Sequence, residues 1–200
     1  GWRCHAARLD RCRQPPERRT HRPPGAAAAE SALTLAQILD RMEARYTDKS
    51  FKAEFVQEST LKAMDITDFA TGRMYVRYPG MMRWEYEKPE KQVIITDGHK
   101  LWIHKPADNQ VMTGSAPAFF SDGKGASFLS DITLVRKKFN ISLVESRDDF
   151  FYELKLQPMQ KTLDVTHIQL SVTKKTFTVI RVVTYNSYGD KNHIEFLNHE

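Results

Sequence analysis

Residues 72–111 read GRMYVRYPGMMRWEYEKPEKQVIITDGHKLWIHKPADNQV and decide the fold class. Within this stretch Met82, Trp84 and Tyr86 alternate with three charged residues. A period of two in apolar and polar side chains is typical of a half-buried β-strand. Pro-Gly and Asp-Gly pairs separate the alternating runs, and both pairs favour tight turns. The stretch therefore predicts short strands joined by turns in an antiparallel sheet.

The same alternation continues on both sides of this stretch. It gives one apolar and one charged face to the predicted sheet. A sheet with one apolar face has to bury that face against another layer. The strands predicted in this way are residues 51–56, 73–78, 82–87, 93–96, 101–104, 139–145, 150–156, 166–173, 176–186 and 193–197.

Little helix is available to cover so much sheet. Residues 34–46 predict one amphipathic helix, opened by a capping box of Thr34 and Gln37. A second, short helical segment is predicted at 116–131, although two glycines interrupt it. The predicted class is α+β. The pattern alone leaves two alternatives open, a fully packed core or an apolar cavity beneath a weakly held helical lid.

Composition excludes several classes of protein. The chain has 200 residues, of which 40% are hydrophobic and 28% charged, which fits one globular domain. No apolar run approaches the roughly 18 residues of a membrane-spanning helix. Residues 1–30 carry +4 of the formal net charge of +5, so the rest of the chain is nearly neutral. That distribution argues against a nucleic-acid-binding face on the folded part.

The first 30 residues differ from the remainder. They are rich in arginine and proline and show no apolar periodicity, which predicts a disordered tail before a folded domain at 31–200. The tail lacks the apolar core of a secretion signal, but the four alanines before Glu30 resemble a cleavage region. We expect an altered N-terminus joined to a mature domain. A basic arm that binds an anionic surface and an artefactual extension are the alternatives.

The stretch 72–111 resembles the LolA family of periplasmic lipoprotein carriers. The helix at 34–46 and the strand at 51–57 also resemble the opening elements of that family. The matching residues, in family order and spacing, are Gly72, Pro79, Gly80, Arg83, Trp84, Tyr86, Pro89, Gln92, Asp97, Gly98, Leu101, Trp102, Gln110 and Val111.

The resemblance implies a fold and a function. The implied fold is a curved antiparallel half-barrel sheet with an N-terminal helix and a short helical lid over an apolar cavity. The implied function is a periplasmic, monomeric carrier that shields the acyl chains of lipoproteins. It would accept them from an ATP-driven extractor in the inner membrane and deliver them to an outer-membrane acceptor, without cofactor, metal or nucleic acid. The alternative is a paralogous half-barrel that carries or senses another lipid or a glycolipid.

Two departures from the family pattern support keeping that alternative. Family members place an arginine directly before the proline and use it to hold the lid. Here Tyr78 stands at that position, and Arg77 points to the opposite face of the predicted strand. The family also continues into a closing segment beyond the position of Glu200, and we expect truncation or divergence there.

The candidate site follows from strand parity and from side-chain chemistry. Methionine and aromatic side chains suit a deformable apolar pocket. Each of these residues could equally belong to an ordinary core. The predicted cavity residues are Met74, Val76, Tyr78, Met82, Trp84 and Tyr86, and the predicted lid or cover residues are Leu35, Ile38, Leu39, Met42, Phe119, Phe120 and Phe128.

Catalytic and metal-binding patterns are not recognisable in the sequence. His99 and His104 stand near two aspartates, but their strand–turn spacing does not predict convergence on a metal. Cys4 and Cys12, the two cysteines of the chain, both lie in the tail. No Gly-x-Ser-x-Gly nucleophile elbow is present. The sequence therefore predicts a binding protein that is not an enzyme.

Overall fold

Strands dominate the folded part of the chain. The computed structural model describes residues 32–119, 121–145 and 148–200, and the predicted tail at 1–30 lies outside them. Leu33–Glu200 form one unit. In chain order its elements are α1 (Leu35–Tyr46), β1 (Ser50–Leu61), η1 (Lys62–Met64), β2 (Ile66–Arg77), β3 (Met81–Lys88), β4 (Gln92–Asp97), β5 (Lys100–Lys105), η2 (Pro106–Asp108), β6 (Gln110–Ser115), α2 (Ala116–Phe119), η3 (Ser121–Ser130), α3 (Thr133–Lys138), β7 (Phe139–Val144), β8 (Phe151–Pro158), β9 (His167–Thr173), β10 (Val179–Tyr185) and β11 (Lys191–Leu197).

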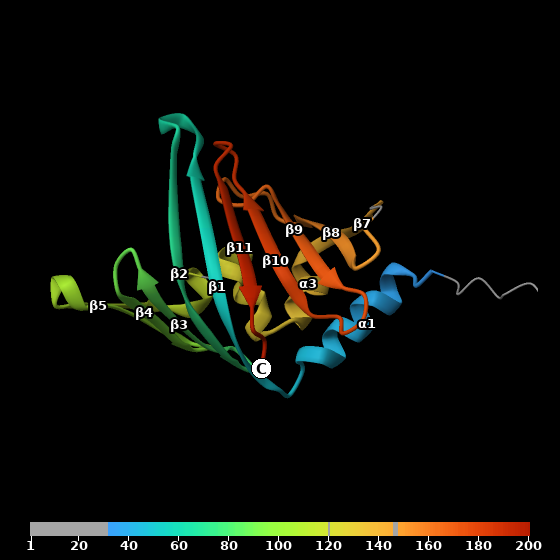
Figure 1. Cartoon of the computed structure of the whole chain (residues 1–200), viewed down its shortest axis with the longest axis horizontal. Coiled ribbons are helices and arrows are strands. Elements are labelled where there is room, and N and C mark those ends of the chain that lie inside the picture. Colours follow the sequence, from blue (N-terminus) through green and yellow to red (C-terminus); the bar gives the residue numbers. More distant parts are fainter. Residues whose placement is uncertain (1–31, 120, 146–147) are drawn as a thin grey trace, which may run out of the picture. The chain divides into compact units, whose positions relative to one another are not determined.

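One antiparallel sheet contains all eleven strands of the described residues, in the order β6-β5-β4-β3-β2-β1-β11-β10-β9-β8-β7. Strands that follow one another in sequence pair along each half, and β1 pairs with β11 at the centre. The edge strands β6 and β7 are connected through α2, η3 and α3. That connection, residues 116–138, crosses one face of the twisted sheet and is called the cover segment below (Figure 1). The predicted α+β half-barrel is confirmed.

The face of the sheet beneath α1 and the cover segment is called the inner face, and the opposite one the outer face. Strand pairing brings the apolar positions of neighbouring strands together on the inner face, because side chains alternate between faces. One buried cluster spans both halves of the sheet and both covering elements. It includes Ile38, Met42, Phe55, Met74, Trp84, Phe128, Leu129, Leu154, Leu170, Val182, Ile194 and Phe196.

Helix α1 begins as the sequence predicts. The side chain of Thr34 accepts a hydrogen bond from the backbone N–H of Gln37, and the Gln37 side chain accepts one from the backbone of Thr34. At its other end, the hydroxyl oxygen of buried Tyr46 accepts a hydrogen bond of 2.8 Å from the backbone N–H of Val179. Burial raises the pKa of Tyr46 to about 12. The helix is thus fixed to strand β10 on the inner face.

Candidate functional site

Four of the predicted cavity residues lie together on the inner face. Strand register places Met74 beside Trp84 and Val76 beside Met82, across β2 and β3. Each of the four is at most 4% exposed. The indole N–H of Trp84 also donates to the sulfur of Met82, at 2.9 Å. These side chains are therefore sealed from solvent by the elements that cover them.

An aromatic cluster continues this inner face toward β1. The ring of Phe55 packs edge-on against Trp84 and Tyr86, with centroid separations of 4.6 and 5.1 Å. The hydroxyl of Tyr86 donates to the side-chain oxygen of Gln57 at 3.0 Å. Burial raises the pKa of Tyr86 to about 12. Tyr86 thus presents its ring to the apolar cluster and keeps its hydroxyl satisfied at the rim.

Gly72 explains how the Phe55 ring fits there. A Cβ on Gly72 would lie 2.0 Å from the backbone oxygen of Glu85 and 2.9 Å from the Phe55 ring. The register between β2 and β3 shifts at this point, as in a β-bulge. Glycine is therefore required for backbone and ring to approach so closely.

The predicted cover residues come from α1 and from the cover segment. Ile38, Leu39, Met42 and Phe128 are buried, and Leu35 is partly buried against the same cluster. The side chain of Phe119 and the whole of Phe120 lie outside the described residues. Both covering elements thus contribute apolar side chains to the inner face.

An ionic contact joins α1 to the end of the cover segment. Arg136 on α3 pairs with Asp40, and its Nε lies 2.7 Å from a carboxylate oxygen of Glu43. Its guanidinium also donates to the backbone oxygen of Ala36. All three partners belong to α1. The side chains of Arg136, Asp40 and Glu43 are 37%, 67% and 29% exposed. Exposed pairs of this kind stabilise by only about 0.2–1 kcal/mol.

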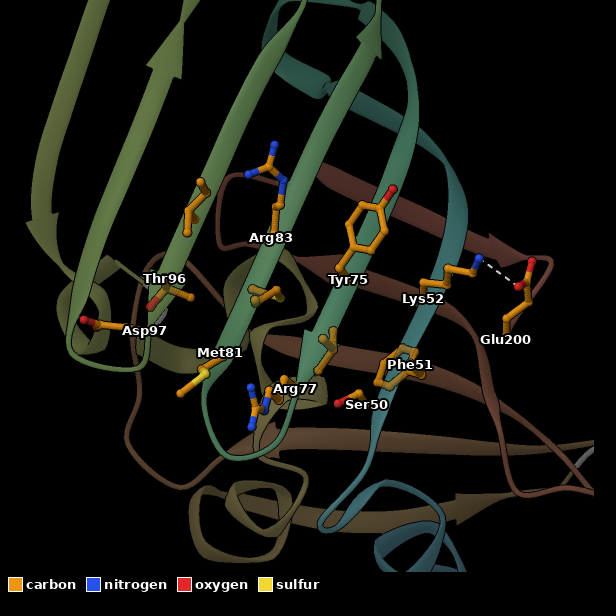
Figure 2. Close-up of a pocket in the computed structure, with 13 residues that line it drawn as sticks. Ser50, Phe51, Lys52, Tyr75, Arg77, Met81, Arg83, Thr96, Asp97 and Glu200 are labelled. Atoms are coloured by element: carbon orange, nitrogen blue, oxygen red, sulfur yellow. Dashed lines mark ion pairs between the residues drawn. The ribbon is translucent and has the colours of Figure 1, made fainter.

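The same strands carry a hollow on their outer face. It has a volume of about 750 Å³ and lies over β1 to β4. Figure 2 shows Tyr75 and Arg83 side by side on β2 and β3, with Met81 and Arg77 nearer the turn that joins these strands. These residues alternate in sequence with the buried residues of the inner face. We call this feature the outer hollow.

Most charges around the outer hollow are compensated locally. Lys52 pairs with Glu200 at 2.8 Å, and the hydrogen bond to Glu200 is the main cause that raises the pKa of Lys52. Arg83 pairs with Glu85 at 2.5 Å. The carboxylate of Asp97 accepts backbone N–H bonds from the turn at residues 99–100, which lower its pKa. Arg77 is exposed and has no ion pair within the described part of the chain.

The comparisons with known proteins agree with this geometry. A family model described as "Outer membrane lipoprotein carrier protein LolA" matches residues 47–200. The chain belongs to the LolA family.

Relatives within the LolA family are distant in sequence. An outer-membrane lipoprotein carrier protein from Coxiella burnetii is 27% identical over 172 residues, covering 85% of this chain and 76% of the relative. A second one, from Alkalilimnicola ehrlichii, is 30% identical over 146 residues, covering 71% and 63%. The crystal structure of a LolA superfamily protein from Nitrosomonas europaea aligns with a TM-score of 0.50 at 15% identity, covering 84% of this chain and 94% of that one. It supports the fold alone.

The lid position that distinguishes this chain from the LolA pattern lies in the β2–β3 turn. Tyr78 follows the last residue of β2, is half-buried, and donates its backbone N–H to Lys49. The neighbouring Gly80 donates its N–H to the backbone oxygen of Ser130 in the cover segment, at 2.8 Å. In the present protein, a backbone hydrogen bond therefore joins the β2–β3 turn to the cover segment, two residues after the position where the family arginine is expected.

Other chemistry finds no support in the described residues. They contain no group of three or more His, Cys, Asp or Glu side chains placed to hold a metal ion. Among them, no helix is long and apolar enough to cross a membrane. The LolA family is a family of carriers, and the inner face offers only apolar and aromatic side chains in the predicted site.

The sequence did not reveal the outer hollow. The alternation predicts a charged, solvent-facing side for these strands, without a hollow. One signal was present, since Tyr75, Met81 and Ile95 interrupt the charged pattern of that face with apolar side chains.

Proposed function

We propose that this protein carries lipoproteins across the periplasm by holding their acyl chains against the inner face. The observation that supports the proposal most strongly is the apolar inner face of a LolA-family sheet, covered by α1 and the cover segment. In this proposal the protein accepts lipoproteins from an ATP-driven extractor in the inner membrane and delivers them to an outer-membrane acceptor. It binds and releases, and performs no catalysis.

The energetics of transfer fit such a carrier. Burial of an acyl chain stabilises it by about 0.8 kcal/mol per CH₂, or on the order of 12 kcal/mol for a chain of about 16 carbons. Exchange between a membrane and an apolar protein face is therefore nearly neutral, whereas exposure to water is prohibitive. The carrier needs a dry, adaptable surface, and Met74, Met82 and Trp84 provide one.

Acyl chains reach the inner face only when the cover segment moves, because the side chains of the inner face are buried in the structure. The polar ties to be broken are few. They include the hydrogen bond from Gly80 to Ser130 and the exposed ion pairs of Arg136 with α1. Ties of this size add little to the free energy of opening. The apolar contacts of the cover segment are then replaced by those of the acyl chain.

Native tryptophans allow a test of which face the chains contact. Trp84 lies on the inner face, whereas Trp102 lies on the outer face, beside Ile95 in the register of β4 and β5. With Trp2 replaced by Phe, the variants Trp102→Phe and Trp84→Phe each leave one tryptophan. A diacylated lipopeptide with brominated acyl chains should quench Trp84 and leave Trp102 unchanged. Quenching of Trp102 alone, or of neither, contradicts the proposal.

A second experiment addresses the cargo. Mass spectrometry of lipid extracted from protein purified from the periplasm should yield acylated lipoprotein fragments. Recovery of glycolipid alone would refute a lipoprotein cargo.

A third experiment addresses the route. Release of radiolabelled lipoprotein from spheroplasts should require both this protein and ATP, as expected if the protein accepts lipoproteins from an ATP-driven extractor.

A further inference from the structure

The outer hollow has the composition of a ligand site, and the side chains of its floor lie on the face opposite the inner face. Apolar side chains form its floor, from Tyr75, Met81 and Ile95. Its volume of about 750 Å³ falls within the usual range of small-molecule sites. Strand alternation keeps this floor on the opposite side of the sheet from Met74, Met82 and Trp84. A ligand can therefore reach it without any movement of the cover segment.

Cations and apolar side chains alternate across the strands in this hollow. One row of register partners runs Lys52, Tyr75, Arg83, Ile95 across β1 to β4. The next row toward the turn runs Arg77, Met81, Asp97 across β2 to β4. Each apolar residue of the floor thus has an arginine as a cross-strand neighbour. A molecule lying on the floor would bring its polar end within reach of a guanidinium.

The charge balance selects an anion. Lys52 and Arg83 each have a carboxylate partner, and Asp97 is engaged by the N–H groups of its own turn. Of the three cations that line the hollow, Arg77 is the one without an ion pair within the described residues. Guanidinium groups bind phosphate and carboxylate oxygens in bidentate geometry.

We infer that the outer hollow binds a single-chain anionic amphiphile, with its phosphate or carboxylate head at Arg77 and its alkyl chain on Tyr75, Met81 and Ile95. This is a second site, distinct from the inner face to which the acyl chains of lipoproteins are assigned under the proposed function. It fills without opening of the cover, so its occupancy does not depend on the carrier cycle.

Decyl phosphate, used below its critical micelle concentration, is a suitable probe. Isothermal titration calorimetry on the full chain should detect saturable binding that weakens as salt is raised, because the site is exposed. Decyl maltoside has the same chain without charge, and inorganic phosphate has the charge without the chain. Both should bind at least about tenfold more weakly, since each lacks one of the two contacts.

Matched variants locate the site. Arg77→Gln should weaken decyl phosphate binding by about tenfold through loss of the charge-assisted contact. Arg181→Gln is the control, because it removes the same charge from a strand arginine that pairs with Glu195 and does not line the hollow. Met81→Asp should abolish binding, and circular dichroism verifies that it folds. Equal effects of Arg77→Gln and Arg181→Gln, or no effect of Met81→Asp, overturn the inference.

The single-tryptophan variants separate this inference from the proposed function. Decyl phosphate with a terminal bromine should quench Trp102, which is next to Ile95, and leave Trp84 unchanged. Quenching of Trp84 instead would place the amphiphile on the inner face and overturn the second site, while the carrier proposal would stand. Failure of the brominated lipopeptide at Trp84 would refute the carrier proposal and leave the outer hollow unaffected. Phosphatidylglycerol vesicles present anionic headgroups in a bilayer. The protein should not co-sediment with them, because the inference concerns a monomeric amphiphile.

Discussion

The inner and outer faces of β1 to β4 are built from alternate residues of the same strands, yet they differ in access. On the inner face Met74, Val76, Met82 and Trp84 are at most 4% exposed beneath α1 and the cover segment. On the outer face Tyr75 and Met81 border a hollow that is open to solvent. A ligand of the inner face has to wait for the cover segment to move, whereas a ligand of the outer face does not.

Apolar composition alone therefore does not locate an accessible site on this sheet. The more apolar face is the sealed one, and its binding is gated by the cover segment. The less apolar face carries the hollow, because nothing in the described chain covers it. Separate variants of the inner face, the outer face and the cover segment test this difference.

The largest expected effect comes from a charge placed on the inner face. Met74→Asp buries a carboxylate among apolar side chains and should lower the free energy of unfolding by more than about 3 kcal/mol. Tyr75→Asp, one residue away on the outer face, should change it by less than about 1 kcal/mol. Urea denaturation followed by circular dichroism measures both. Similar losses for the two variants would mean that the faces are not distinct.

A second prediction concerns close packing within the inner face. Gly72→Ala should destabilise by about 2–3 kcal/mol, because its Cβ would overlap the Glu85 carbonyl and the Phe55 ring. Gly114→Ala is the control, since a Cβ there meets no atom within 4 Å. Its effect should stay within about 0.5 kcal/mol in the same denaturation assay. A tolerated alanine at position 72 would show that β2 and β3 can separate locally without cost.

Alkaline pH gives a third prediction, through Tyr86. Burial raises its pKa in the folded state to about 12, above the value of about 10 in an unfolded chain. The stability that this shift represents is complete below pH 10 and is lost as the pH rises toward 12. Tyr86→Phe should therefore reduce the loss of stability between pH 9.5 and 11.5 by about 2 kcal/mol. Tyr75→Phe, on the outer face, is the matched control, and an equal change in both variants would refute the assignment to burial.

Much of this architecture follows from the sequence, and what does not follow has identifiable causes. The alternation around Trp84 correctly separates the two faces, and the capping box of Thr34 and Gln37 is confirmed. Strand β6 was missed because all six of its residues are exposed, so no apolar period marks it. Helix α3 was missed because its six residues are too few to show a helical period.

The outer hollow could not be predicted for a different reason. Whether Tyr75, Met81 and Ile95 enclose a hollow depends on the twist of the sheet and on rotamers, which the alternation of residues does not encode. The ion pairs of Arg136 were missed because they join α3 to a helix nearly 100 residues earlier. Sequence spacing alone does not bring such distant segments together.

That ionic contact carries the smallest expected effect, and it tests whether the inner face is gated. Arg136→Gln removes the pairs with Asp40 and Glu43, which should lower the free energy of opening by about 0.5–1 kcal/mol. Amide hydrogen exchange in residues 126–138 should then accelerate by up to about fivefold, with global stability nearly unchanged. Lys137→Gln, the next residue, makes no ion pair within the described residues and should leave exchange at its original rate. If Arg136→Gln accelerates exchange but not the binding of brominated lipopeptide at Trp84, opening of this segment is not the step that admits acyl chains. If both accelerate together, the weak pairs of Arg136 set the rate at which the sealed face becomes available.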